Sequence, residues 1–430
     1  MALADILMAI ILAGLVLYVV LGGADFGAAV WQVLAGRGPH AEAIREHAHD
    51  SMAPVWEANH VWLIFVLTVL WTAFPEAFGS LASTLTVPLF AAAIGIILRG
   101  AAYALRAGTS SPAQVRVIDM VSAVASVLTP FALGAAVGGI ASGRVPVGNA
   151  AGDLFSSWLN PTSIIIGALS VATSAYLAAV FLAADAVRRE EHDLAPEFRR
   201  RALVAGVVAG VLAVAGVVAL RFDARGLFDE LVGGPGLPGV IVSVLAGLLT
   251  FALLWRGRHE AARYTSAVAV AGIVAGWALA QSPRVLPGLT LRQAAAPHDT
   301  LVATLVAVLA GGAILFPSLA LLFRLVLGGR LGEGVQEPAA MPHSARGLLA
   351  VSVRGLLGRA AGACLIAGLG FLTVAEAGWA HAVGVAALAG FVVLGFLAAA
   401  PELVAPPDAG PPAHTGTEAG GSPGVGRGGG

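Results

Sequence analysis

One acidic residue, Asp25, interrupts an otherwise continuous apolar segment near the start of the chain. It lies in the stretch GGADFGAAVW, residues 22–31, inside an apolar run that extends from Ile6 to about Ala35. A charged side chain at the depth of a bilayer costs at least about 2.5–3.5 kcal/mol, so such a residue is by default a candidate for function. Asp25 therefore indicates proton or ion chemistry inside a membrane.

Two further ionisable residues lie in the next two apolar segments. Glu57 is part of MAPVWEANHVWL, and Arg99 is part of IILRGAAYALR. All three groups lie toward the same membrane face, with Arg99 roughly 10 Å and Asp25 roughly 15 Å from it at 1.5 Å per helical residue. Buried acids beside an arginine differ in proton affinity, which stepwise proton transfer requires. We therefore predict that Asp25 and Glu57 form a proton path and that Arg99 supports it.

Polar and aromatic side chains around Glu57 are candidates for supporting roles. Asn59 and His60 add hydrogen-bonding groups, and Trp56 and Trp62 flank them. An unperturbed imidazole such as that of His60 titrates near neutral pH. The alternatives are structural: an acid–arginine pair that neutralises itself and locks the helices, tryptophans at the membrane interface or in the core, and a hydrogen-bonded histidine on a helix face.

The composition requires that these residues be positioned by membrane helices. The chain has 430 residues, 58% of them hydrophobic and 11% charged, and its mean hydropathy is +0.87. These values exclude an ordinary soluble domain. Apolar runs of roughly 18–25 residues recur, the length that crosses a hydrocarbon core about 30 Å thick as a helix. We predict an all-α polytopic membrane protein with helices near residues 5–35, 53–73, 81–106, 117–140, 162–187, 202–220, 237–255, 262–281 and 299–327.

Beyond this nine-helix domain, which spans residues 1–330, the composition changes. A polar, Pro-containing linker at 331–347 precedes apolar stretches at about 348–372 and 379–399, which predict two additional transmembrane helices within 348–400. Residues 401–430 are rich in Pro and Gly and predict a disordered tail. The two added helices pack peripherally, take the place of a small accessory subunit, or are a lineage-specific addition, and the sequence leaves these three readings open.

The distribution of arginines predicts the orientation. The loops after the first, third, fifth, seventh and ninth helices hold most of them, including Arg199, Arg200 and Arg201, whereas the intervening loops hold few. Cytoplasmic loops carry the excess of basic residues. We therefore expect the N-terminus outside and the C-terminus in the cytoplasm, so that the acids face a polar inlet from the cytoplasm.

The sequence contains no motif for several other kinds of chemistry. The net charge is −1 and no basic block is present, so we expect no nucleic-acid partner. The single cysteine, Cys364, matches no metal-binding spacing. Only His60 lies within the nine predicted spans, so the chain lacks the paired histidines of a bis-histidine haem site. We expect this chain to hold no metal and to provide no haem ligand.

Several blocks resemble subunit II of the cytochrome bd-type quinol oxidases. They are GGADFGAAVW, SMAPVWEANHVWLIFVLTVLWTAFPEAF, LRGAAYALR, and GWALAQSPRVLPGLTLRQAAAPHDTLVATL followed by PSLALLFRLVLG, and the resemblance covers about residues 5–328. It implies nine helices, arranged as two four-helix bundles plus one peripheral helix. It also implies that Asp25 is the family's first-helix acid, that Glu57 is the acid after Trp56, where either Asp or Glu is found, and that Arg99 is the third-helix arginine. Ala58 stands where many members have glycine.

The resemblance implies a respiratory function performed with a partner. Quinol oxidation and the reduction of dioxygen to water would occur in subunit I, which carries two b haems and haem d. This chain would lie in the bacterial inner membrane, in contact with lipid and quinone, support assembly of subunit I and contribute a proton path through Asp25 and Glu57. A stand-alone proton-coupled transporter with the same buried acids is the alternative, and a purely structural scaffold is a third reading.

Overall fold

The computed structural model describes residues 3–107, 112–191, 193–327, 356–374 and 378–399, and at some of these, including 52–58, it describes the backbone alone. The chain divides into two compact units, Met1–Leu321 and Leu322–Gly430. The predicted linker at 331–347 and the predicted tail at 401–430 lie outside the described residues. The two units are treated separately below.

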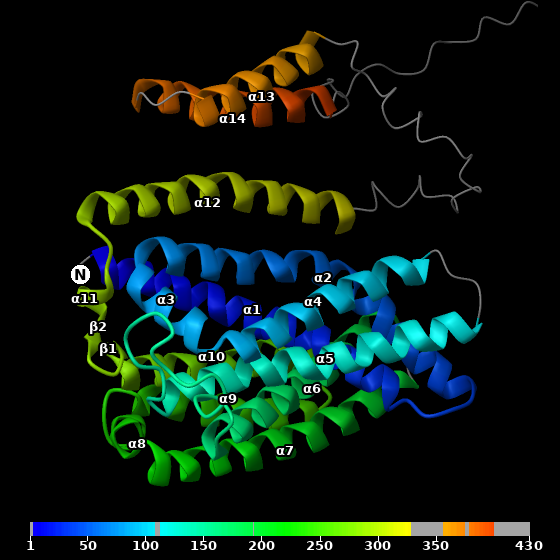
Figure 1. Cartoon of the computed structure of the whole chain (residues 1–430). Helices are drawn as coiled ribbons and strands as arrows, with labels where there is room; N and C mark the ends of the chain where they lie inside the picture. The colour runs from blue at the N-terminus through cyan, green and yellow to red at the C-terminus, as the bar shows by residue number, and fades with distance from the viewer. Residues whose placement is uncertain (1–2, 108–111, 192, 328–355, 375–377, 400–430) are drawn as a thin grey trace, which may run out of the picture. The chain divides into compact units, whose positions relative to one another are not determined.

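Helices make up nearly all of the described secondary structure (Figure 1). Eight described helices are long and apolar enough to cross a membrane, and the described apolar part of α2, Asn59–Ala73, is shorter. The predicted all-α membrane fold is therefore confirmed. The long helices are α1 Leu3–Val33, α2 Pro39–Ala73, α4 Thr86–Ala107, α5 Pro112–Ala141, α6 Pro161–Arg188, α7 Leu194–Asp223, α9 Leu237–Trp255, α10 His259–Gln281, α12 His298–Leu327, α13 Leu356–Val374 and α14 Gly378–Ala399. The short elements are α3 Pro75–Thr84, α8 Arg225–Val232, α11 Leu291–Ala294 and the antiparallel strands β1 Arg284–Leu286 and β2 Leu289–Thr290.

The first unit contains two groups of four helices. In one group α1 packs against α2 and α5, and α4 packs against α5; in the other, α6 packs against α7 and α10, and α9 packs against α10. Extensive contacts of α6 with α1 and α5 join the groups (Figure 1). Only 11% of the apolar window of α12 is buried, and Leu301 near its start lies in a core cluster of this unit. The arrangement is that of two four-helix bundles and one peripheral helix.

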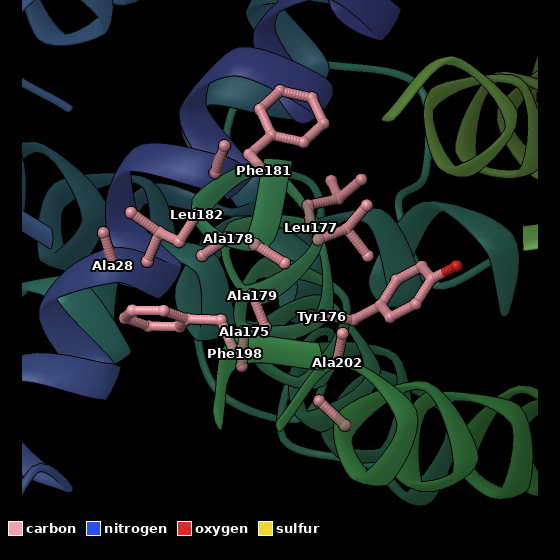
Figure 2. Close-up of a cluster of buried hydrophobic side chains, with 14 of the residues drawn as sticks. Ala28, Ala175, Tyr176, Leu177, Ala178, Ala179, Phe181, Leu182, Phe198 and Ala202 are labelled. Atoms are coloured by element: carbon pink, nitrogen blue, oxygen red, sulfur yellow. The ribbon is translucent and has the colours of Figure 1, made fainter. Parts of the chain in front are cut away.

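The middle of α6 is enclosed on all sides. Every residue from Ser174 to Ala184 is buried, and the stretch is rich in alanine, whose small side chain lets neighbouring helices approach closely. Figure 2 shows this stretch with Ala28 of α1 and with Phe198 and Ala202 of α7, all members of one hydrophobic cluster. Because α6 is surrounded, it positions α1 and with it Asp25.

α2 is longer than predicted. It begins at Pro39 rather than at residue 53, because residues 39–52 form an amphipathic helix that buries Ala41, Ile44 and Ala48 on one face. Because the outer face of this segment is charged, a search for apolar runs alone does not detect it as a helix. The sequence predicted Glu57 in the first turns of this helix. Because α2 begins at Pro39, Glu57 instead lies in the middle of a long helix.

Two other boundaries also differ from the prediction. The helix expected at 81–106 is divided at Leu85, so that α3 precedes α4. The helix expected at 202–220 begins earlier, at Leu194, and its charged first turns are stabilised by Glu197, which pairs with Arg200 and Arg201. These pairs are three and four residues apart, a spacing that supports a helix outside the apolar region.

In the second unit, α13 and α14 pack against each other. Gly368 of α13 faces Leu388 of α14, and a Cβ atom at Gly390 would lie 3.4 Å from the Cys364 sulfur. The order of these contacts makes the pair an antiparallel hairpin. Helices are therefore present in both predicted stretches. Their described apolar parts, Arg359–Gly368 and Ala382–Leu394, are shorter than the candidate spans, so a crossing of the membrane by α13 and α14 stays a prediction.

Candidate proton-transfer site

Asp25 and Arg99 form a buried ion pair between α1 and α4. Arg99 Nε donates a hydrogen bond to Asp25 Oδ2 at 3.0 Å, and Arg99 Nη2 bonds both Oδ1 and, at 2.9 Å, the Asp25 backbone carbonyl. Asp25 is 1% exposed and Arg99 is 8% exposed. The pairing neutralises two charges where either alone would be costly. Two of the three predicted ionisable residues are thus brought together.

Arg99 also connects α4 to α5. Its Nη1 donates a hydrogen bond to Ser126 Oγ at 2.5 Å, and the Ser126 hydroxyl donates to the Ser122 carbonyl at 2.6 Å. The guanidinium carbon lies 5.4 Å from the centre of the Phe26 ring, a favourable position for a cation above an aromatic face. Since all three guanidinium nitrogens have partners, Arg99 is held in one orientation.

Glycines next to Asp25 bring α1 close to its neighbours. A Cβ atom at Gly27 would overlap the backbone carbonyl of Ser174 in α6, and one at Gly22 would lie 2.7 Å from Asn59 Oδ1 in α2. At Gly27 only glycine permits the approach, because the obstacle is backbone, whereas at Gly22 the Asn59 side chain would have to move. Close approach is the usual role of small residues between membrane helices. The sequence GGADFG therefore places Asp25 in the interior of the helix assembly.

Asn59, one of the predicted supporting residues, is completely buried beside Gly22. Neither its amide nitrogen nor its amide oxygen has a hydrogen-bond partner among the described residues, and the same is true of the buried Tyr18 hydroxyl. Buried polar groups are almost always hydrogen-bonded to protein or to ordered water. Tyr18 lies two helical turns before Asp25 in α1, so these groups continue a polar line from Asp25 into the apolar interior.

The other predicted supporting residues are described in part. His60 is half-buried, and the Trp62 ring packs edge-on against Phe65 with the centroids 6.1 Å apart. Trp56 and Glu57 belong to α2, but their side chains lie outside the described residues. Contact between Glu57 and the Asp25–Arg99 pair therefore stays a prediction.

A small cavity of about 40 Å³ ends on the Asp25–Arg99 pair. This volume holds at least one water molecule. Arg106 of α4 and Asp119 of α5, which also line the cavity, form an ion pair with each other. Arg106 lies two helical turns beyond Arg99, roughly 10 Å along α4. The lining residues therefore extend from the buried pair to the last turn of α4.

Sequence reasoning missed most of the residues that line this cavity. Gln32 follows Asp25 by seven residues and Tyr103 follows Arg99 by four, and both line the cavity. Helical spacing could have identified them, because residues four and seven apart share a helix face. Other lining residues gave no such signal in the sequence; they are His49, Asp119 and Ser122.

The groups around Asp25 suit proton transfer. They comprise the Asp25 carboxylate, the Arg99 guanidinium, the Tyr18 hydroxyl and the Asn59 amide. In the part of the chain that the structure describes, no three His, Cys, Asp or Glu side chains are grouped as metal ligands are. Carboxylates and hydroxyls hold and pass protons through short hydrogen bonds.

Comparison with known proteins identifies the family. Residues 3–326 match the family described as cytochrome bd terminal oxidase subunit II. The chain belongs to this family. A Bacillus subtilis protein described as a cytochrome bd menaquinol oxidase subunit II is 23% identical over 246 residues, 55% of this chain and 68% of that protein. The Bacillus subtilis cytochrome bd ubiquinol oxidase subunit 2 is 30% identical over 129 residues, 30% of this chain and 36% of that relative.

The bd oxidase from Geobacillus thermodenitrificans has a similar fold. The TM-score is 0.63 at 24% identity, and the alignment covers 76% of this chain and 99% of the other. The family predicted from the sequence is confirmed, and this bd-type subunit II is part of a terminal oxidase. The family match ends at residue 326 and so does not include α13 and α14.

Proposed function

We propose that this chain is the haem-free subunit of a quinol:dioxygen oxidoreductase, and that it supports assembly of the haem-bearing subunit I and supplies protons from the cytoplasm. The observation that carries the proposal is the small cavity whose wall includes the buried Asp25 and reaches Arg106 in the last turn of α4. Reduction of dioxygen to water consumes protons, and an apolar assembly needs a polar route for them. Asp25 is the inner acid of this route, and Glu57 is proposed as the second.

The haems are proposed to lie in subunit I. Haem b and haem d provide the redox chemistry there, and this chain's own residues hold and move protons. A bis-histidine site needs two facing histidines, and His60 is the only histidine within the nine predicted spans. No haem ligand is therefore proposed in this chain, and no step of the proton route passes through a haem.

The electron donor is proposed to be a quinol, because one relative carries menaquinol and another ubiquinol in its name. The proposed location is the bacterial inner membrane, with lipid around the helices. The loop arginines support an outer N-terminus, so that the cavity opens toward the cytoplasm. Arg37, Arg45 and Arg106 lie at that end of the helices.

A structural role for the pair is the strongest competing reading. All three guanidinium nitrogens of Arg99 and both carboxylate oxygens of Asp25 have partners, as expected of a lock between helices. A stand-alone proton-coupled transporter is the other competitor. Co-isolation with a haem-bearing membrane protein supports the oxidase and is incompatible with the transporter.

Replacement of Asp25 by Asn tests the proton route. Loss of one partner of a buried pair costs about 3–5 kcal/mol, so the yield of the complex should fall, and the rate must be expressed per haem. We expect the oxygen-consumption rate per haem to fall by about 100-fold or more, the scale of a lost proton-transfer group. The measurement is oxygen uptake and proton uptake by the purified complex.

Ser126→Ala is the matched control, because it removes a hydrogen bond from Arg99 and leaves the carboxylate in place. The proton-route proposal predicts a lower yield with a normal rate per haem for this control. If the Asp25→Asn complex takes up oxygen and protons at the wild-type rate per haem, Asp25 is a structural residue and the proposed route is wrong.

A further inference from the structure

His49 lies along the cavity, between the buried ion pair and the outer one. Its ring packs against the Tyr103 ring with the centroids 5.7 Å apart, and Tyr103 lies one helical turn beyond Arg99 and about one turn before Arg106 on α4. His49, Tyr103 and both ion pairs line the same cavity. The imidazole is therefore placed part-way along the route that ends on Asp25.

The chemistry of the lining residues distinguishes His49 from the others. The two aspartates of the cavity wall are each paired with an arginine, and a guanidinium does not lose its proton in proteins. A tyrosine hydroxyl has an ordinary pKa near 10. Among the described residues of the cavity wall, the imidazole is thus the one group whose ordinary titration falls near neutral pH.

We propose that His49 is the proton-relay residue between the cytoplasmic surface and Asp25, an inference that rests on the proton route proposed above. A hydronium ion at the mouth gives its proton to an imidazole nitrogen and becomes water. The imidazolium then gives a proton to a cavity water or to the Asp25 carboxylate and returns to the neutral ring. No electrons move, and each proton taken from the mouth arrives on the inner acceptor.

The charges around His49 favour release of a bound proton over its retention on the ring. Burial, Arg106 and Arg99 lower the pKa of His49 below its ordinary value, and Asp50 opposes them. A lowered pKa favours the neutral ring, which can accept a proton and release it readily. The ionisable groups that face it are Asp50 on its own helix, Arg99, Tyr103 and Arg106 on α4, Asp119 on α5 and Asp25 on α1.

His49→Gln in the complete oxidase complex tests the relay. Glutamine keeps a polar, hydrogen-bonding side chain but does not titrate. We expect the oxygen-consumption rate per haem to fall by about tenfold, with the greatest loss above pH 7, where protons are scarce. Added imidazole should restore a large part of the rate, because a free base small enough to reach the cavity mouth replaces the missing one. A merely structural role of the ring would not respond to imidazole.

His40→Gln is the control, since His40 is exposed at the start of the same helix and does not line the cavity. Its rate and pH profile should match the wild type. A His49→Gln complex with the wild-type rate and pH profile would overturn the relay, and so would a loss that imidazole leaves unchanged. The Asp25→Asn result separates the two proposals: if that variant is slow while His49→Gln is normal, the route stands and the relay fails.

Discussion

At the scale of single residues, Arg99 is the most heavily bonded side chain of the site. It contacts both oxygens of the Asp25 carboxylate, the Asp25 carbonyl and the Ser126 hydroxyl. Lysine carries the same charge but lacks the planar fork that makes these bonds together. The charge and the bonding pattern of Arg99 can therefore be separated experimentally.

Arg99→Lys is expected to destabilise the complex while keeping the buried pair neutral. Each lost hydrogen bond to a charged group is worth about 1.5–3 kcal/mol, so thermal melting of the purified complex should shift to clearly lower temperature. Arg200→Lys is the comparison, because the Arg200 side chain is 75% exposed and exposed pairs contribute about 0–1 kcal/mol. Equal melting temperatures for the two variants would contradict this account of Arg99.

The sequence was sufficient to find Asp25 and Arg99 and insufficient to find their surroundings. A charge in an apolar run is conspicuous because it is costly, and that cost identified both partners before any geometry was known. Ser126 and His49 are ordinary polar residues in their own segments. Only the packing of α5 and α2 beside α4 brings Ser126 to Arg99 and His49 to Tyr103. For Glu57 the proton role remains a prediction.

At the scale of helices, the contact between α1 and α6 is the closest one near the site. Gly27 of α1 lies directly against the backbone of Ser174 in the enclosed part of α6. A methyl group at this position has no flexible side chain to displace, so the two helices would have to separate. The position of Asp25 depends on this contact.

Gly27→Ala should destabilise the folded subunit by about 1–3 kcal/mol, the usual cost of overpacking. Gly210→Ala in α7 is the matched control, because a Cβ atom there meets nothing within 4 Å, and alanine in a helix is favoured over glycine by up to about 1 kcal/mol. Thermal melting of both variants in detergent measures the difference. If the Gly27→Ala variant melts at or above the melting temperature of the Gly210→Ala control, the close contact between α1 and α6 is refuted.

The helices themselves were largely predictable, and their ends were not. Apolar runs reveal spans because every membrane helix needs a stretch of similar length. The first turns of α2 and α7 are amphipathic or charged, so their helical state comes from burial of one face and from side-chain pairs. The division at Leu85 left no mark in hydropathy, since the last turn of α3, residues 81–84, reads as the start of the apolar run of α4.

At the scale of the whole molecule, the α13–α14 hairpin is the part without a counterpart in the family match. That match ends at residue 326, and the related oxidase chain aligns over 76% of this chain while being covered almost completely itself. The nine-helix region therefore contains what the family has in common. Whether the hairpin is peripheral, replaces an accessory subunit or is a lineage-specific addition is a question of assembly.

Deletion of residues 331–430 should leave a chain that still co-purifies with the haem-bearing subunit and consumes oxygen at the full rate per haem, because Asp25, Arg99 and the cavity lie in the first unit. The haem spectrum and oxygen uptake of the truncated complex measure this. Loss of the haem-bearing partner on truncation would instead show that the hairpin is needed for assembly, as an accessory subunit is.

The tight seam between Gly27 and Ser174 also has a kinetic consequence. With α1 and α6 held together, the proposed route needs no separation of the two helices, and its moving parts are side chains and water. Typical enzymes turn over about 1–1000 times per second, so each proton transfer along the route must recur within about a millisecond to a second while this contact stays closed.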